Sequence, residues 1–130
     1  MPLKLENPST VAPPQGRYTH VVEVPAGAGL VFISGQVPVA PDGSVAPTLA
    51  EQADQVYANV VAVLAAKGIP PHNIIKLTTF FTEEDDPDDC VRKARAKHLG
   101  EHRPASTAVC VRRLVDPAWK IEIEAVALTP

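Results

Sequence analysis

The stretch His102–Leu128, HRPASTAVCVRRLVDPAWKIEIEAVAL, carries the clearest fold signal in the chain. A proline-bounded turn leads into an apolar run over Ser106–Leu114, and a second run over Lys120–Leu128 alternates isoleucine with glutamate. Apolar runs of this length predict two strands, and the alternation has the period of two that strands require. Glu122 and Glu124 therefore lie on one face of the last strand, about 6.5–7 Å apart.

The two acids share their face with apolar residues, because Val126 and Leu128 continue the alternation. A face of this kind is seldom left bare in water, so the acids either take part in chemistry or border an interface. Glu122 could instead form an ion pair with Arg112 or Arg113 on an antiparallel neighbour. The sequence leaves these alternatives open.

The composition restricts the class of protein. A chain of 130 residues is expected to form one domain over 1–130, and its net charge of -3 without a basic stripe makes nucleic acid an unlikely partner. No apolar stretch is long enough to span a bilayer. Cys90 and Cys110 have no metal-ligand spacing and no signal segment is evident, so we expect a cytoplasmic protein with reduced thiols and no metal or other cofactor.

The first half of the chain predicts two strands and a helix. Residues 1–14 are rich in proline and are expected to form an extended arm. Tyr18–Val24 and Leu30–Gln36 read as strands, and PAGAG between them favours a hairpin. The sequence TLAE at 48–51 has the spacing of a capping box, which starts a helix that ends at Gly68.

The second half predicts a further strand and helix before the two strands first described. Ile74–Thr82 is rich in β-branched and aromatic residues and is expected to be a central strand. Asp86 is the predicted cap of the second helix, with Pro87 as its first residue and Leu99 near its end. The order ββαβαββ predicts an α+β fold with one sheet and both helices on one face. The uncovered face predicts a homo-oligomer.

Several segments, taken in their order, resemble the RidA family, also called YjgF/YER057c/UK114. They are GRYTH, LVFISGQVP, KLTTFFT, the EHRPA turn and the closing KIEIEAVAL. The resemblance implies a chorismate-mutase-like fold and a homotrimer with small-molecule clefts between subunits. Its best-known branch hydrolyses reactive imines and enamines, such as 2-aminoacrylate, to a keto acid and ammonia.

The resemblance also implies a site. Glu122 is the implied catalytic residue, acting through a bound water, and the implied substrate-binding residues are Tyr18, Ser34, Gly35, Arg92, Ser106, Thr107 and Ala108. The deaminase branch reads RPAR where this chain reads RPAS, so Ser106 stands where the branch has its carboxylate-binding arginine. Ordinary 2-aminoacrylate deamination is therefore not the expected reaction. Arg92 on the second helix is the residue that could supply the positive charge instead.

Three functions remain open from the sequence. The first is a trimeric hydrolase or deaminase of small imines, enamines or related metabolites. The second is a non-catalytic trimer that binds or senses a small ligand, and the third is the endoribonuclease or translation-inhibitor activity for which some family members are named. The net charge argues against the third. His98 and His102 have zinc-like i,i+4 spacing, but Gly100 and Pro104 interrupt the helix, so solvated histidines are expected.

Overall fold

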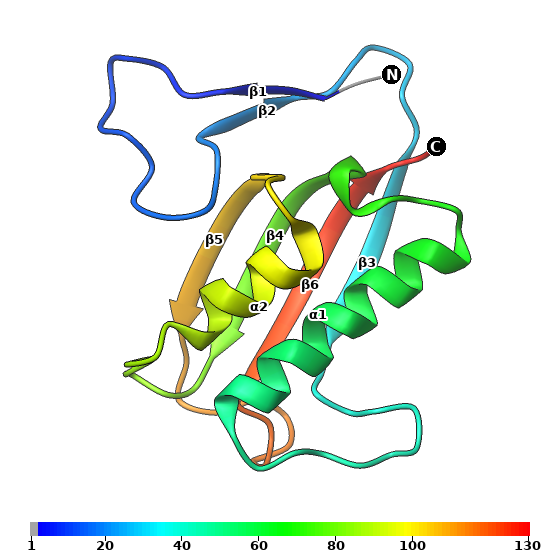
Figure 1. Cartoon of the computed structure of the whole chain (residues 1–130). Helices are drawn as coiled ribbons and strands as arrows, with labels where there is room; N and C mark the ends of the chain where they lie inside the picture. Colours follow the sequence, from blue (N-terminus) through cyan, green and yellow to red (C-terminus); the bar gives the residue numbers. More distant parts are fainter. Residues whose placement is uncertain (1–2) are drawn as a thin grey trace.

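The computed structural model describes residues 3–130 and contains a four-stranded sheet in the order β3-β6-β4-β5 (Figure 1). The strands are β3 (Leu30–Gln36), β4 (Ile74–Phe81), β5 (Ala105–Cys110) and β6 (Ile121–Leu128). β6 runs antiparallel to both of its neighbours, whereas β4 and β5 are parallel. The prediction that the strand at 74–82 lies centrally is confirmed.

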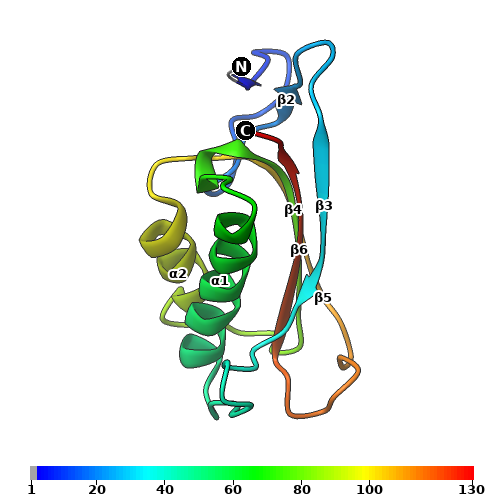
Figure 2. The ribbon, with the colours of Figure 1, turned by 90° about the vertical axis from the view of Figure 1, so that its right-hand side faces the viewer.

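Two helices, α1 (Leu49–Ala66) and α2 (Cys90–Leu99), cover one face of this sheet, and Figure 2 shows the other face uncovered. The alternation in β6 explains the arrangement, because Ile121 and Ile123 are fully buried beneath the helices while Glu122 and Glu124 point to the other side. A short 3₁₀ helix, η1 (Pro71–Asn73), precedes β4. The predicted α+β fold with both helices on one face is thus confirmed.

The predicted hairpin at the start of the chain is wrong. β2 (Val21–Glu23) pairs with β1 (Lys4–Glu6) in a separate two-stranded sheet, and β3 pairs with β6 instead. The reason is burial: β6 is a long interior strand whose apolar residues line the core, and a three-residue neighbour cannot match it as a partner for β3. The arm predicted for 1–14 therefore includes the strand β1, which was not predicted, and its first two residues lie outside the described ones.

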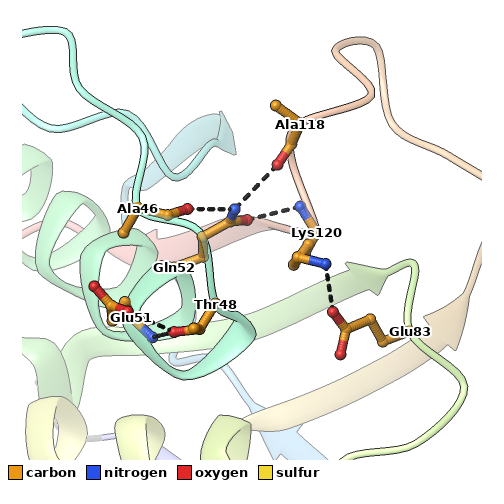
Figure 3. Close-up of polar contacts among 7 residues, drawn as sticks. All are labelled: Ala46, Thr48, Glu51, Gln52, Glu83, Ala118 and Lys120. Carbon is orange, nitrogen blue, oxygen red and sulfur yellow. Dashed lines mark hydrogen bonds and ion pairs between the residues drawn. The ribbon is translucent and has the colours of Figure 1, made fainter.

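The first helix begins as predicted. The hydroxyl of Thr48 accepts from the backbone N–H of Glu51 at 3.2 Å and donates to the Glu51 carboxylate at 2.8 Å. Figure 3 shows the next residue, Gln52, whose buried amide donates to the carbonyls of Ala46 and Ala118 and accepts from the N–H of Lys120. One side chain of α1 thus connects the segment before the helix to the segment that leads into β6.

The second helix begins three residues later than predicted. Pro87 is not its first residue: α2 starts at Cys90, after Asp89 in a left-handed conformation (φ 53). Asp86 still caps the helix from outside, because its carboxylate accepts from the N–H groups of Cys90 at 2.9 Å and Val91 at 3.1 Å. An aspartate that reaches two amides can begin a helix without being the adjacent cap residue.

β5 also differs from its prediction, since it ends at Cys110 and the predicted strand continued to Leu114. In the loop that follows, the guanidinium of Arg113 donates to the carbonyls of Leu114 and Val115. These local bonds satisfy the backbone without a strand partner. Neither helix within residues 3–130 combines the length and apolarity needed to cross a membrane.

Candidate functional site

Four of the predicted site residues surround one cavity on the helix side of the sheet. The cavity has a volume of about 480 Å³ and lies between the segment 15–18, α2 and the edge strand β5. It is lined by Tyr18, Arg92, Ser106 and Ala108 from the predicted set, and also by Gln15, Gly16, Arg17, Asp86, Asp89, Val91 and Arg95. Cavities of this size accept small metabolites.

The strand register explains why Ser106 and Ala108 reach this cavity. They pair with Leu77 and Thr79 of β4, two buried residues on the helix side, so residues 106 and 108 also point toward the helices. Tyr18 lines the cavity from the segment 15–18, and its hydroxyl accepts from the N–H of Gln15 at 3.1 Å.

A second group of predicted residues lies elsewhere, at the junction of β3 and β6. Glu122 points to the uncovered face and reaches over the backbone of Gly35, where the register of β3 shifts between Ile33 and Gln36. A Cβ atom at residue 35 would lie 2.8 Å from Cδ and 3.0 Å from Cγ of Glu122. Glycine at this position therefore leaves the room that the glutamate side chain occupies.

Glu122 forms no ion pair within the part of the chain that the structure describes. Among residues 3–130, no lysine, arginine or histidine nitrogen lies within 4.0 Å of its carboxylate. The alternative in which Glu122 pairs with Arg112 or Arg113 is therefore wrong, because the shorter β5 carries both arginines into the loop beyond the sheet. The half-buried carboxylate is free to bind a water or a ligand.

Thr107 belongs to the uncovered face as well, because it pairs with Thr78, and its hydroxyl accepts from the Lys76 ammonium at 2.6 Å. A shallow hollow of about 380 Å³ on this face is lined by Phe32, Ile33, Ser34, Lys76, Thr78, Glu124, Ala125 and Val126. Within one chain, Glu122 and Ser106 thus lie on opposite faces of the sheet and two strands apart, roughly 10 Å along the sheet alone. One copy does not bring the predicted site residues together.

The structure adds a residue that the sequence reading missed, Arg95 of α2. Its side chain is buried, with 8% of the residue exposed, and it lines the cavity beside Ser106. The guanidinium donates from Nε to the Tyr57 hydroxyl at 2.8 Å, from Nη1 to the Arg17 carbonyl at 3.1 Å and from Nη2 to the Ser106 hydroxyl at 3.1 Å. A signal was present: Arg95 falls on the apolar stripe of the helix, four residues after Val91 and four before Leu99.

The other ionisable groups around the cavity have partners. Arg92 lies exposed at the rim and pairs with Asp89 at 3.5 Å. Burial opposes ionisation of Asp86, but hydrogen bonds from the Cys90 thiol and from the amides of Val91 and Cys90 outweigh it and lower the pKa of Asp86. Burial and the Asp86 carboxylate raise the pKa of Cys90 to about 11, so its thiol is protonated at neutral pH.

The histidines do not form a metal site. Within residues 3–130, no three His, Cys, Asp or Glu side chains gather as a metal would require. His98 Nε2 lies 2.8 Å from Asp54 Oδ1, and His102 Nε2 lies 2.7 Å from the Ile74 carbonyl. Both rings are partly buried, so the expectation of solvated histidines is wrong. Burial also lowers the pKa of His102.

The fold and the cavity define an α+β protein in which two helices cover one face of a four-stranded sheet, with a metabolite-sized cavity at the sheet edge. A family model described as Endoribonuclease L-PSP matches residues 9–129. The chain therefore belongs to this family, which is the YjgF/RidA family that its sequence resembles.

Relatives of known name and structure agree with this assignment. The Escherichia coli protein named "Putative reactive intermediate deaminase TdcF" is 33% identical over 117 residues, which cover 87% of each chain. The crystal structure of the Rid-family protein YyfB from Yersinia pestis has a TM-score of 0.85 at 29% identity and covers 98% of this chain and 99% of its own. The structure of E. coli TdcF with bound serine has a TM-score of 0.69 at 32% identity, and the match covers 97% of this chain and 98% of the TdcF chain.

Proposed function

We propose that this protein is a cytoplasmic homotrimer that hydrolyses small imines or enamines in a cleft between subunits. One subunit contributes Glu122 with Ser34 and Gly35, and its neighbour contributes the cavity around Tyr18 and Ser106. The observation that carries the proposal is the position of Glu122, which is half-buried, lies over a glycine and has no ion-pair partner among residues 3–130. A carboxylate placed in this way can hold a water molecule and transfer its protons.

The proposed reaction needs one water and two proton movements. Glu122 accepts a proton as the water oxygen attacks the C=N carbon, and the C=N π electrons move to nitrogen, which takes up a proton. In the resulting carbinolamine, Glu122 transfers the hydroxyl proton to the nitrogen, the C–N bond breaks, and ammonia leaves from a carbonyl product. An enamine enters the same sequence after its carbon is protonated to the imine.

The relatives support this class of substrate. TdcF is named as a deaminase of reactive intermediates, and its crystal structure contains serine, a small amino acid. A small nitrogen-bearing metabolite is therefore the ligand class that we carry over to this chain. The cavity of about 480 Å³ has room for such a molecule.

The surface of the sheet supports the assembly. Phe32 is 76% exposed on the uncovered face, and Leu30 on the same strand is 47% exposed. Apolar side chains of this size are stabilised when another protein surface covers them. A second copy of the chain packed on this face could also bring a Glu122 to a Ser106, which a single copy holds on opposite faces.

The test is ammonia release from two freshly generated imines, one with a carboxylate (2-iminopropionate) and one without, in wild type, Glu122→Gln and Ser106→Arg. We expect hydrolysis by the wild type that falls about 100-fold or more in Glu122→Gln. Ser106→Arg is expected to lower the rate on 2-iminopropionate, because the new guanidinium would meet that of Arg95, which lies 3.1 Å from the Ser106 hydroxyl. A wild-type rate equal to that of buffer for both imines would contradict the proposal.

Two other outcomes identify the alternatives. A wild type that binds a small ligand and never turns it over would be the non-catalytic binding or sensing trimer. The family description also names an endoribonuclease, but the net charge of -3 gives little attraction for RNA phosphates. Cleavage of RNA by highly purified wild type, lost in Glu122→Gln, would favour that activity over imine hydrolysis.

A further inference from the structure

Arg95 is a buried cation whose charge no described carboxylate balances. No carboxylate lies within 4.0 Å of its guanidinium among residues 3–130. Its three hydrogen-bond partners, the Tyr57 and Ser106 hydroxyls and the Arg17 carbonyl, are all neutral. A guanidinium has five N–H donors, so two of them remain after these bonds. A buried charge is costly unless an opposite charge compensates it, and no carboxylate among residues 3–130 does so for Arg95.

The charged neighbours of Arg95 do not supply that anion. Arg92 is paired with Asp89, and Arg17 lies 3.7 Å from Glu101. The Asp86 carboxylate accepts from the start of α2. Of the three arginines that line the cavity, Arg95 alone has no acidic partner in residues 3–130, and it is the most deeply buried.

We infer that Arg95 binds the carboxylate of a small ligand in this cavity, with the Ser106 hydroxyl as a second donor. The hydroxyl accepts from Nη2 of Arg95 and can donate its own proton to the same carboxylate. The two aspartates in the cavity wall disfavour a doubly charged group such as phosphate, so the ligand carries a single carboxylate.

This inference rests on the proposed function for the identity of the cavity as the ligand site, and it goes further by naming the ligand class and the residue. It also explains serine at position 106. Arg95 lies on the neighbouring helix α2, and its guanidinium contacts the hydroxyl of residue 106. A longer cationic side chain at residue 106 would therefore collide with the Arg95 guanidinium. The positive charge comes from α2 rather than from β5, and from Arg95 rather than from the predicted Arg92.

The experiment is a titration with pyruvate, followed by the ¹⁵N NMR signals of the Arg95 side-chain N–H and the Ser106 amide. We expect saturable shifts in wild type and none with pyruvamide, which has the same shape without the charge. Arg95→Lys should weaken pyruvate binding by about 10-fold or more, because an ammonium lacks the planar pair of donors. The exposed control Arg112→Lys, which lies outside the cavity, should change it less than about 3-fold.

A second variant keeps the test independent of folding. If Arg95→Lys does not melt cooperatively, Ser106→Ala removes one donor and leaves the bonds of Arg95 to Tyr57 and Arg17, and it should weaken pyruvate binding by about 3- to 10-fold. The inference is overturned if a folded Arg95→Lys, or Ser106→Ala in its place, binds pyruvate as wild type does. Wild type without shifts at roughly 50 mM pyruvate overturns it too.

The two proposals fail in different ways. Imine hydrolysis that depends on Glu122, together with pyruvate binding that ignores Arg95, would overturn this inference and leave the proposed function in place. Pyruvate binding that depends on Arg95, in a protein that hydrolyses neither imine, would support this inference and overturn the proposed function.

Discussion

At the scale of single residues, Glu122 and Gly35 occupy adjoining space. The substitution Gly35→Ala should displace the carboxylate, because the new methyl group would meet the end of a glutamate side chain that can turn away. We expect a change in unfolding free energy within about 1 kcal/mol but a loss of imine hydrolysis of about 10-fold or more. Thermal melting and the rate of ammonia release measure the two effects.

Gly29→Ala is the matched control for this substitution. Its Cβ would also meet a side chain, Thr129, with Oγ1 at 2.8 Å, but this contact involves no predicted site residue. Its activity should stay near that of wild type. Equal losses of activity in the two variants, or a Gly35→Ala protein as active as wild type, would show that the position of Glu122 does not matter for the reaction.

The residues of the site differ in how far sequence could predict them. Glu122 and Ser106 stand in motifs whose order is visible along the chain, and the alternation in β6 was enough to place Glu122 on the uncovered face. Arg95 stands in no such motif. Its importance depends on which side of α2 meets β5, and that contact is made between elements that the helix sequence alone does not orient.

At the scale of elements, α2 depends on the carboxylate of Asp86. Asp86→Ala removes the acceptor for two helix amides and should lower the unfolding free energy by about 0.5–2 kcal/mol, whereas Asp86→Asn keeps one acceptor oxygen and should cost less. Asp88→Ala, an exposed acid in the same loop, is the control and should be nearly neutral. Urea unfolding at one protein concentration measures all three.

The same carboxylate makes the stability depend on pH. The pKa of Asp86 is lower in the folded protein than in the unfolded chain, so its contribution is present above the unfolded value near 4 and is lost as the pH falls through the folded value. Wild type should therefore lose more stability than Asp86→Ala between about pH 5 and pH 2. Parallel pH profiles for the two proteins would contradict this assignment.

Helix α1 makes its own long-range connection through Gln52. Gln52→Met leaves the carbonyls of Ala46 and Ala118 and the N–H of Lys120 without their partner, and should lower the unfolding free energy by about 2–4 kcal/mol. Gln55→Met, which loses only a bond to the Asn59 side chain, should cost less than about 1 kcal/mol. Calorimetry should give a lower melting temperature for Gln52→Met than for Gln55→Met. Similar values would show that Gln52 does not connect the two segments.

At the scale of the whole molecule, the uncovered face of the sheet is the proposed interface between subunits. Phe32→Asp places a charge on that face and should convert the proposed trimer of 13.8 kDa chains into monomers, as measured by sedimentation equilibrium. Val115→Asp is the control, since Val115 is 83% exposed in the loop after β5 and lies off the sheet. Dissociation by both variants, or by neither, would place the interface elsewhere.

The architecture could be predicted in part from the sequence. The number and face of the helices follow from two periodic segments and the alternation in β6, because these patterns are local. The partner of β3 could not be predicted in this way, because a local hairpin and a pairing with β6 would use the same residues of β3. The structure favours the distant pairing, which sets Leu30 beside Leu128.

That pairing sets an order of events when the chain is synthesised. β6 lies between β3 and β4, so until residues 121–128 have been made β3 has no partner in this sheet and β4 has only β5. Both helices leave the ribosome earlier and have an incomplete surface to pack against. The core is therefore complete only after β6 has been made, and until then the unpaired apolar strands can associate with other chains.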